Sequence, residues 1–509
     1  MNRRRIIGLV LLACIVILLA IRGCLPSHRA PQPASPPPRE VFDSTKPFVL
    51  RVISGNANDA GHEAGHEAWL TRELNSLLSL AGLQIAASQP IAPTRLFELQ
   101  VLYSGTAAEL KLVAPDQVVE HQESISFTDA SRLQVTQELL RHLLKVVGHA
   151  SNRNVELALD FKPAHFDALT EAIDEIEGAN SRGFTDVGDK VSHAQAVTKL
   201  ERIVRLHPRN PRALGALALG YLSVGGPDHQ SLLDLAEKTA QRSLSLNQQF
   251  ADSHAALGLV AFRRNQWTSA RESLDRALKL EPNSLPALEG LACVLANAGQ
   301  LGQAAVYAKR TLTLHRENVG ARDCLSYAQP LQPQDATQTS AQKSAAAMVA
   351  ATVAMLSNNY SSARELLSAA TSASAMRSWG ESLLDAAQHP THVSIALQRV
   401  TEAALEDHID STQVLLSGVA LQNSDFVFNR ITRLRVDQEP EPLRILWLPQ
   451  AAFLRKHSRF ERIVSDAELP AYWHEYGRPD ICNREPTVYG CSELPPPHPP
   501  RGRQSSSPR

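Results

Sequence analysis

A pattern of small and large apolar residues repeats with a period of 34 residues through the middle of the chain. The clearest copy spans residues 251–284, with pattern positions at Leu257, Gly258, Ala261, Ala270, Leu274, Ala277 and Pro282. The next copy has Leu291, Ala292, Leu295, Ala304 and Ala308 in phase. Looser upstream copies carry Leu219, Gly220, Ala236 and Ala240, and before them Ala196, Leu200, Ile203 and Pro208. One such repeat cannot bury its apolar face alone, so we expect the copies to stack into a helical array.

These positions make physical sense for pairs of antiparallel helices. Small residues fit where two helices cross closely, large apolar residues fill the space between pairs, and proline ends each pair. The pattern resembles the tetratricopeptide repeat, although His254 and Ala261 stand where that family prefers Trp and Tyr. The resemblance implies a mainly α fold with a helical solenoid over residues 160–330. Degenerate helical repeats are expected over residues 340–445.

The composition agrees with a helical protein of several domains. A chain of 509 residues is too long for one hydrophobic core. Aromatic residues make up only 5% of it, which fits packed helices better than a β-rich fold. The 51 Lys and Arg residues nearly balance the 52 Asp and Glu residues, so no global positive field attracts nucleic acid. We therefore expect no nucleic-acid partner.

The N-terminal sequence has the features of a membrane anchor. Residues 3–5 are arginines, and the 16 residues at 6–21 contain no charged or strongly polar side chain. As a helix these would span roughly 24 Å, enough for a thin bilayer. The positive charge predicts an inside N-terminus and an outside remainder, which in a bacterial inner membrane means a cytoplasmic N-terminus and a periplasmic bulk. We favour an uncleaved signal anchor, with lipoprotein processing at Cys24 and a twin-arginine signal as open alternatives.

Two different segments lie between this span and the repeats. Residues 22–45 are proline-rich, which predicts a semi-rigid linker. Residues 46–150 combine strand-like runs with helical patterns and predict a small α/β domain, with strands expected at 47–54, 95–105, 108–115 and 118–127 and helices at 68–83 and 131–147. The order of these elements resembles the TolB amino-terminal and FlgO-like domains of bacterial envelope proteins.

Residues 446–485 are dense in aromatic and polar side chains. The distinctive positions are Arg455, Arg459, Phe460, Leu469, Pro470, Tyr472, Trp473, Gly477, Pro479, Asp480 and Cys482. They resemble a module that follows tetratricopeptide arrays in bacterial CadC-like regulators and adenylate-cyclase-type sensors. The resemblance implies that Phe460, Tyr472 and Trp473 cap the apolar end of the array and that no catalysis takes place there. Those proteins carry an output domain before the span, where this sequence has only residues 1–5, so the resemblance implies neither transcriptional nor cyclase activity.

The cysteines suggest disulfide chemistry and no metal site. Cys482 and Cys491 could close a small loop if this part of the chain faces an oxidising compartment. Cys293 and Cys324 fall on helices that the repeat pattern makes neighbours. Neither spacing is that of a zinc ribbon or a Cys-x-x-Cys pair.

One string does match a zinc-protease motif. "HEAGH", from His62 through Glu63 to His66, has the spacing that places two imidazoles on one helical face beside a general base. The string is half of a tandem "AGHEAGHE", its glycines weaken a helix, and apolar neighbours are missing. Glu73 is a conceivable third ligand. We regard a zinc metallohydrolase as the least favoured hypothesis and a loop as the better interpretation.

The expected function is therefore binding. In a solenoid the first helix of each pair lines the concave face. The residues expected to bind a protein or peptide partner there are Asp252, Leu259, Phe262, Arg263, Glu289 and Asn297. The alternative that these residues only pack or face water remains open. A small-ligand sensor using residues 46–150 is a second alternative.

The sequence thus predicts a non-enzymatic, membrane-anchored scaffold or sensor in envelope assembly or signalling, without cofactor. Its expected organisation is a cytoplasmic tail at 1–5, a transmembrane anchor at 6–21, a linker at 22–45, an α/β domain at 46–150, a solenoid at 160–330, degenerate repeats at 340–445, a capping module at 446–485 and a disordered tail at 486–509.

Overall fold

The structure is a computed structural model. It describes residues 42–54, 64–86, 96–127, 130–180, 187–224, 229–316, 318–328, 345–371, 376–406, 409, 411–436 and 443–491. The expected cytoplasmic tail and membrane anchor, and nearly all of the linker, lie outside these residues. Within them, no helix has both the length and the apolar character needed to cross a bilayer.

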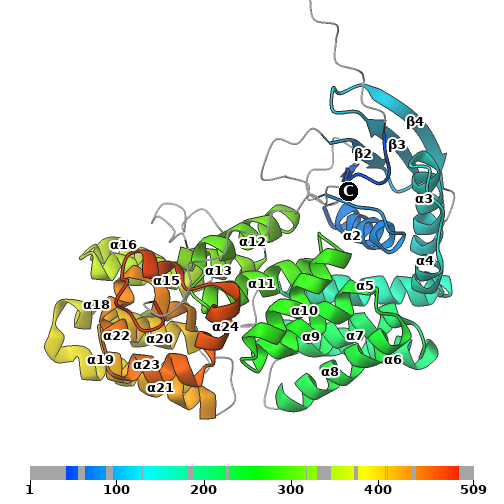
Figure 1. Cartoon of the computed structure of the whole chain (residues 1–509). Coiled ribbons are helices and arrows are strands. Elements are labelled where there is room, and N and C mark those ends of the chain that lie inside the picture. The colour runs from blue at the N-terminus through cyan, green and yellow to red at the C-terminus, as the bar shows by residue number, and fades with distance from the viewer. Residues whose placement is uncertain are drawn as a thin grey trace, which may run out of the picture. The chain divides into compact units, whose positions relative to one another are not determined.

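The expected α/β domain is a four-stranded sheet with two helices on one face (Figure 1). Its elements are β1 (Val49–Ser54), α2 (Ala64–Leu80), β2 (Glu98–Tyr103), β3 (Ala107–Val113), β4 (Val119–Ser126) and α3 (Arg132–Val146). β1 and β2 pair in parallel, which the α2 crossover makes possible, and β2, β3 and β4 follow as an antiparallel meander. Alternate residues such as Leu99, Val101 and Leu110 are buried, so one face of the sheet packs on the helices.

A short helix, α4 (Arg153–Ala158), leads into pairs of antiparallel helices. These are α5 (Pro163–Asn180) with α6 (Val187–Leu206), α7 (Pro211–Ser223) with α8 (His229–Leu246), α9 (Ala251–Arg263) with α10 (Trp267–Leu280), and α11 (Leu285–Asn297) with α12 (Leu301–Leu314), followed by α13 (Val319–Ala328). Helices α7, α9, α11 and α13 each contact the next helix of this series, and they form the inner layer.

Gly258, a small residue of the 34-residue pattern, lies at a helix crossing, as predicted, and so does Gly290, which the pattern does not include. A Cβ atom on Gly258 of α9 would come within 2.6 Å of Leu274 Cγ in α10. A Cβ on Gly290 of α11 would come within 2.9 Å of Leu274 Cδ2. One leucine therefore fills the space between three helices, and only glycine lets both neighbours approach it this closely.

The array continues with α15 (Ala345–Leu356), α16 (Tyr360–Ala370), a π-helical turn at Met376–Gly380, α18 (Glu381–Gln388), α19 (Val393–Leu405), α20 (Ser411–Ala420) and α21 (Ser424–Val436). The pairs α15–α16 and α20–α21 share one turn geometry with α9–α10 and α11–α12. In the four turns, the residues with positive φ are Asn265, Gly299, Asn358 and Gln422. The residue after each donates its backbone N–H to a carbonyl five residues back, at 2.8–2.9 Å. The same helix ending also follows α2 at Gly82 and α3 at Gly148 in the small domain, so it is not specific to a repeat and the assignment of residues 340–445 as degenerate repeats stays a prediction.

The C-terminal module consists of short helices: η3 (Leu443–Trp447), η4 (Pro449–Ala451), α22 (Ala452–Arg455), α23 (Arg459–Asp466), α24 (Leu469–Tyr476) and η5 (Asp480–Asn483). Cys482 and Cys491 are joined by a disulfide. The ordered chain therefore continues past residue 485, where a disordered tail was expected to follow, because the disulfide and the buried Val488 hold this turn against the module. Residues 492–509 lie outside the described part.

Candidate functional site

The inner face of helices α9 and α11 carries four of the six residues expected to bind a partner. Leu259, Phe262, Arg263 and Glu289 are all partly buried there. Phe262 packs edge-on against Trp267, with ring centroids 5.8 Å apart. Leu259 lies 3.0 Å from the Cβ position of Gly290 on the next inner helix. We call Leu259, Phe262, Arg263 and Glu289 the inner-face site.

Arg263 is the charged centre of this site. Burial lowers the pKa of Arg263 to about 10, and the negative charge of Glu289 partly offsets that shift. Among the described residues, the guanidinium has no hydrogen-bond partner. A partly desolvated cation without a hydrogen-bonded anion is costly, so this group favours an incoming carboxylate.

Glu289 is hydrogen-bonded to a residue at the start of the next helix. Its Oε2 accepts a hydrogen bond from Asn318 Nδ2 at 2.9 Å, and Asn318 in turn accepts from the backbone N–H of Ala321 at the start of α13. Burial raises the pKa of Glu289, while the hydrogen bond from Asn318 lowers it. The Glu289 carboxylate therefore accepts a hydrogen bond from Asn318, which caps α13. The N–H groups of Arg263 have no hydrogen-bond acceptor among the described residues.

The other two expected residues belong to different clusters. Asp252 lies in the first turn of α9, where its charge raises the pKa of the buried Glu281. Asn297 is fully buried, which corrects the expectation that it lies on an accessible face. Its side-chain oxygen accepts from the backbone N–H of Arg444 at 3.2 Å, so the C-terminal module covers it.

The stretch "YWHEYGRPDICNRE" packs against the turn between α11 and α12, in the middle of the helical series, which corrects the expectation that the module covers the end of the array. Trp473 donates its indole N–H to the carbonyl of Ala298 at 2.8 Å, and Trp447 donates to that of Asn297 at 2.7 Å. Asp480 accepts from the backbone N–H of Gly302 at 2.6 Å. Arg455 is fully buried and binds both carboxylate oxygens of Glu485, at 2.6 and 3.0 Å. These groups are all engaged in contacts within the protein, so their role is structural.

The small domain is joined to the first repeats by ion pairs, of which Glu73–Arg212 is buried. Glu73 of α2 pairs with Arg212 of α7, and these side chains are 1% and 7% exposed. Asp174 of α5 accepts from Arg72 at 2.9 Å and from Arg132 at 3.2 Å. Glu73, named above as a conceivable zinc ligand, is thus already paired. The loop expected at the HEAGH string is corrected in part, because α2 begins at Ala64 and its backbone includes His66. His62, Glu63 and the side chain of His66 lie outside the described part of the structure.

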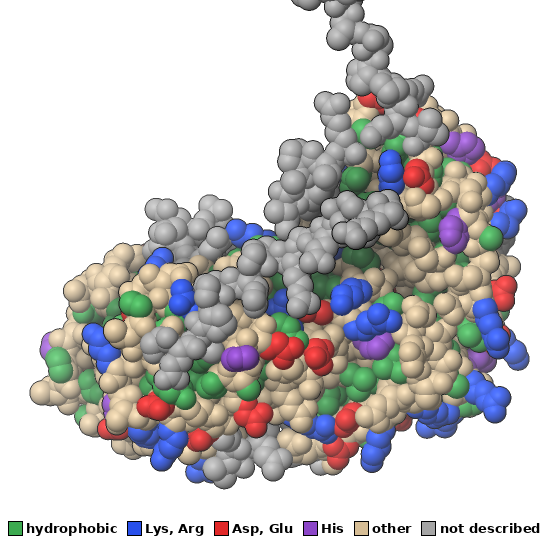
Figure 2. Space-filling model, in the orientation of Figure 1, with side chains coloured by type: hydrophobic (Ala, Val, Ile, Leu, Met, Phe, Trp, Pro, Cys, Tyr) green, Lys and Arg blue, Asp and Glu red, His purple; other side chains and the backbone are tan. Residues whose placement is uncertain are grey.

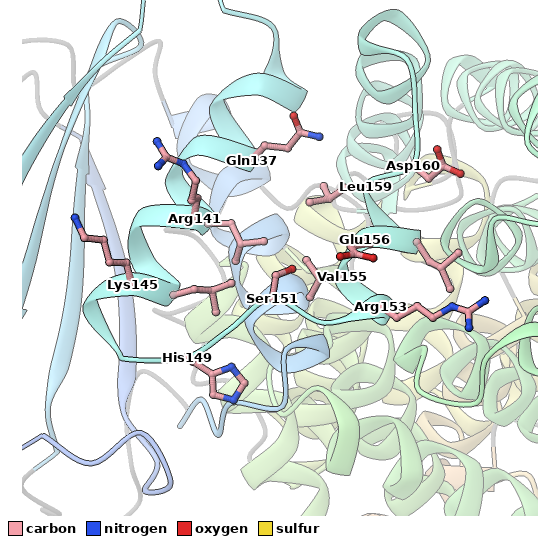
Figure 3. Close-up of a pocket in the computed structure, with 13 residues that line it drawn as sticks. Gln137, Arg141, Lys145, His149, Ser151, Arg153, Val155, Glu156, Leu159 and Asp160 are labelled. Carbon is pink, nitrogen blue, oxygen red and sulfur yellow. The ribbon is translucent and has the colours of Figure 1, made fainter.

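A cavity of about 730 Å³ lies between α3 and α4, beside the small domain (Figure 3). Its floor includes the buried residues Leu140, Leu144 and Val155. Arg141 and Lys145 extend toward the sheet and away from α4 (Figure 3). A binding site normally needs several polar groups that converge on the ligand. The charged groups here diverge, so this cavity is a weaker candidate than the inner-face site.

The charge distribution also matches the sequence. On the face shown in Figure 2, Lys and Arg side chains are interspersed with Asp and Glu side chains and form no single-sign patch. Two features of the structure could not be predicted from the sequence, namely the Glu73–Arg212 pair and the surroundings of Glu281, because their residues come from distant segments. Asp385, His389 and His392 were not predicted to form a cluster, although their spacing within eight residues is visible in the sequence.

No protein-family model matches the sequence, and a search of curated proteins gave no significant match. Solved structures similar to the chain include pilF of Pseudomonas aeruginosa, at 16% identity, 54% of this chain, 93% of that chain and a TM-score of 0.24. A tetratricopeptide repeat protein of Parabacteroides merdae has 14% identity, 56% and 99% coverage and a TM-score of 0.27. Yeast Tom70 has 11% identity, 70% and 80% coverage and a TM-score of 0.31. Because these scores are low, the repeat assignment rests on the chain's own helix pairs, and the resemblance to CadC-like regulators stays a prediction.

Proposed function

We propose that the chain is a non-catalytic scaffold that binds a protein segment on the inner faces of α9 and α11. The observation that carries this proposal is Arg263, a partly buried guanidinium without a hydrogen-bond partner among the described residues. A carboxylate of the partner would accept from it, and this charge-assisted bond would be strong at a partly desolvated site. Leu259 and Phe262 supply apolar surface next to it.

We also propose that residues 6–21 anchor the protein in a bacterial inner membrane, with the repeats in the periplasm. The apolar character of residues 6–21 and the arginines before them support this topology. The Cys482–Cys491 disulfide supports it independently, because such bonds persist in oxidising compartments. Protease protection in spheroplasts tests it: the repeats should be cleaved from outside, and protection of the repeats would refute it.

The binding proposal is tested by photo-crosslinking in living cells with a probe at Phe262, followed by mass spectrometry of the adducts. One recurrent protein should be captured by the parent chain and lost in Arg263→Ala. Arg264→Ala is the matched control, because the neighbouring Arg264 turns outward to Asp234 and Glu237, each at 2.7 Å. The control should retain the adduct.

Two results would contradict the proposal. One is the same adduct profile in both arginine variants, since the open guanidinium would then not contribute to binding. The other is no adduct above background from the inner-face site, which would redirect the search to the small domain and its cavity. Purified Arg263→Ala should keep the parent's helical circular dichroism, which separates loss of binding from loss of fold.

A further inference from the structure

Two histidines and an aspartate meet at the end of α18. Asp385 lies in the last turn of this helix, His389 follows its end, and His392 closes the turn Pro390–His392 that leads into α19. The backbone N–H of His389 donates to the carbonyl of Asp385 at 2.8 Å, and that of His392 donates to the carbonyl of His389 at 2.9 Å. This turn directs three side chains from eight consecutive residues to one place.

The three side chains are arranged around the carboxylate. Nδ1 of His392 lies 2.6 Å from Oδ2 of Asp385, and Nδ1 of His389 lies 3.2 Å from Oδ1. The two imidazoles stack, with centroids 5.5 Å apart and planes 28° from parallel. One potential ligand atom from each residue lies within 4.8 Å of the other two.

These distances are close to those of a metal site. Zinc bonds of about 2.0–2.1 Å in tetrahedral geometry separate neighbouring ligand atoms by about 3.3 Å. The His389 nitrogen already has this separation from the carboxylate, and the exposed His392 needs only a small side-chain shift. In the described part of the chain, the ion pairs of Asp385 are those with these two histidines, so no lysine or arginine competes for the carboxylate.

The donor set selects the class of metal. Two imidazoles and one carboxylate suit Zn²⁺, Co²⁺, Ni²⁺ or Cu²⁺, whereas Mg²⁺ and Ca²⁺ prefer sites made only of oxygen. The side chains of Asp385, His389 and His392 are 49%, 59% and 49% exposed. Water therefore has access to complete the coordination.

We propose that Asp385, His389 and His392 bind one divalent transition-metal ion of the Zn²⁺ class. The ion would tie the end of α18 to the start of α19, two helices that lie side by side (Figure 1). Because the unfolded chain does not hold the three ligands together, binding would stabilise the folded state.

The test is a Zn²⁺ titration of the metal-free, full-length protein against a chromophoric chelator. The parent for this experiment carries His62→Ala and His66→Ala, which removes the two histidines of the HEAGH string. We expect one Zn²⁺ per chain and an increase in melting temperature on adding Zn²⁺. Asp385→Asn, His389→Ala and His392→Ala should each weaken binding about 10-fold or more.

His474→Ala is the matched control, because His474 is an exposed histidine on α24 and outside the triad. It should leave both the affinity and the zinc-dependent melting shift unchanged. The proposal is overturned if the parent takes up no stoichiometric Zn²⁺, or if the triad variants bind as tightly as His474→Ala. The triad is exposed, so its variants should keep the parent's circular dichroism.

Discussion

At the residue scale, the contact between the small domain and the repeats raises the pKa of the Glu281 carboxyl group. Glu281 is only 8% exposed. Burial, with the nearby charges of Asp252 and Glu73, raises the pKa of Glu281 to about 8, although Ser76 and Arg212 oppose the shift. The folded protein therefore holds a proton that the unfolded chain releases near the ordinary carboxyl pKa.

This shift predicts a pH dependence of stability. Because the folded state binds the extra proton, its stability should fall as pH rises from the ordinary carboxyl range through about 8. Glu281→Gln replaces the titrating carboxyl group with a neutral amide. The variant should have a free energy of unfolding about 1–3 kcal/mol higher than the parent at pH 8.5, with little difference below pH 4. Urea denaturation at both pH values measures it, and a pH-independent difference would show that Glu281 does not titrate in this range.

At the scale of the elements, the crossing of α9 and α10 depends on Gly258. Alanine is the better helix former, but its Cβ would lie 2.6 Å from Leu274 Cγ. Overpacking at this crossing should prevail, so Gly258→Ala should lower the free energy of unfolding by about 1–3 kcal/mol. Leu274→Ala alone should lower it by about 2–5 kcal/mol.

The double variant separates steric overlap from a general loss of stability. In Gly258→Ala/Leu274→Ala the new methyl group fills part of the cavity that Leu274→Ala leaves. The losses of unfolding free energy in the two single variants should therefore sum to more than the loss in the double variant. Chemical denaturation of the four proteins gives the coupling energy. Strict additivity would mean that the glycine is not required by Leu274.

The turns between paired helices give a second prediction at this scale. Gln422 has a φ of 51°, in the left-handed region that favours glycine, at the position that Gly299 occupies in the α11–α12 turn. Gln422→Gly should therefore raise the free energy of unfolding by about 0.5–1 kcal/mol. Asn358→Gly is the matched comparison. Its gain in the free energy of unfolding should be smaller, because asparagine adopts the left-handed backbone conformation more readily than glutamine does. A loss of stability in Gln422→Gly, measured by thermal denaturation, would contradict the strain assigned here.

At the scale of the molecule, contacts join the small domain, the helix pairs and the C-terminal module into one unit over residues 43–509. The buried Glu73–Arg212 pair is a principal link between the first two parts. The module packs against the middle of the array through Trp473 and Trp447, whose indoles donate to the backbone of the α11–α12 turn. Stability should therefore be shared between the parts.

Removing one partner of the buried ion pair tests this sharing. Arg212→Met removes the closer of the two guanidinium groups that pair with the buried Glu73 and leaves Arg72 at 3.7 Å, so it should lower the free energy of unfolding by up to about 3–5 kcal/mol. Glu73→Gln/Arg212→Met should recover part of the loss, because no lone charge remains buried. Calorimetry should show a single transition for the parent and an earlier, separate one in Arg212→Met. An unchanged profile in Arg212→Met would mean that the pair does not join the domains.

Much of the fold could be predicted from the sequence because it is encoded locally. The 34-residue period, the glycines and alanines at the crossings and the alternation of the strands are short-range patterns, and each determines which face of its own element is buried. These patterns predicted the helix pairs, the small sheet and the candidate inner-face residues Phe262 and Arg263. They also identified Cys482 and Cys491 as a possible pair.

Only the tertiary structure decided which of these side chains remain available. Asn297 matches its repeat position as well as Arg263 does, yet the C-terminal module covers it, and the segment that does so starts 146 residues later, at Leu443. The partners of Glu73, Asp252 and Glu281 likewise come from segments far apart in the chain. A local pattern specifies which face of a helix is apolar. Whether another element then covers a given side chain depends on long-range packing, which no local period encodes.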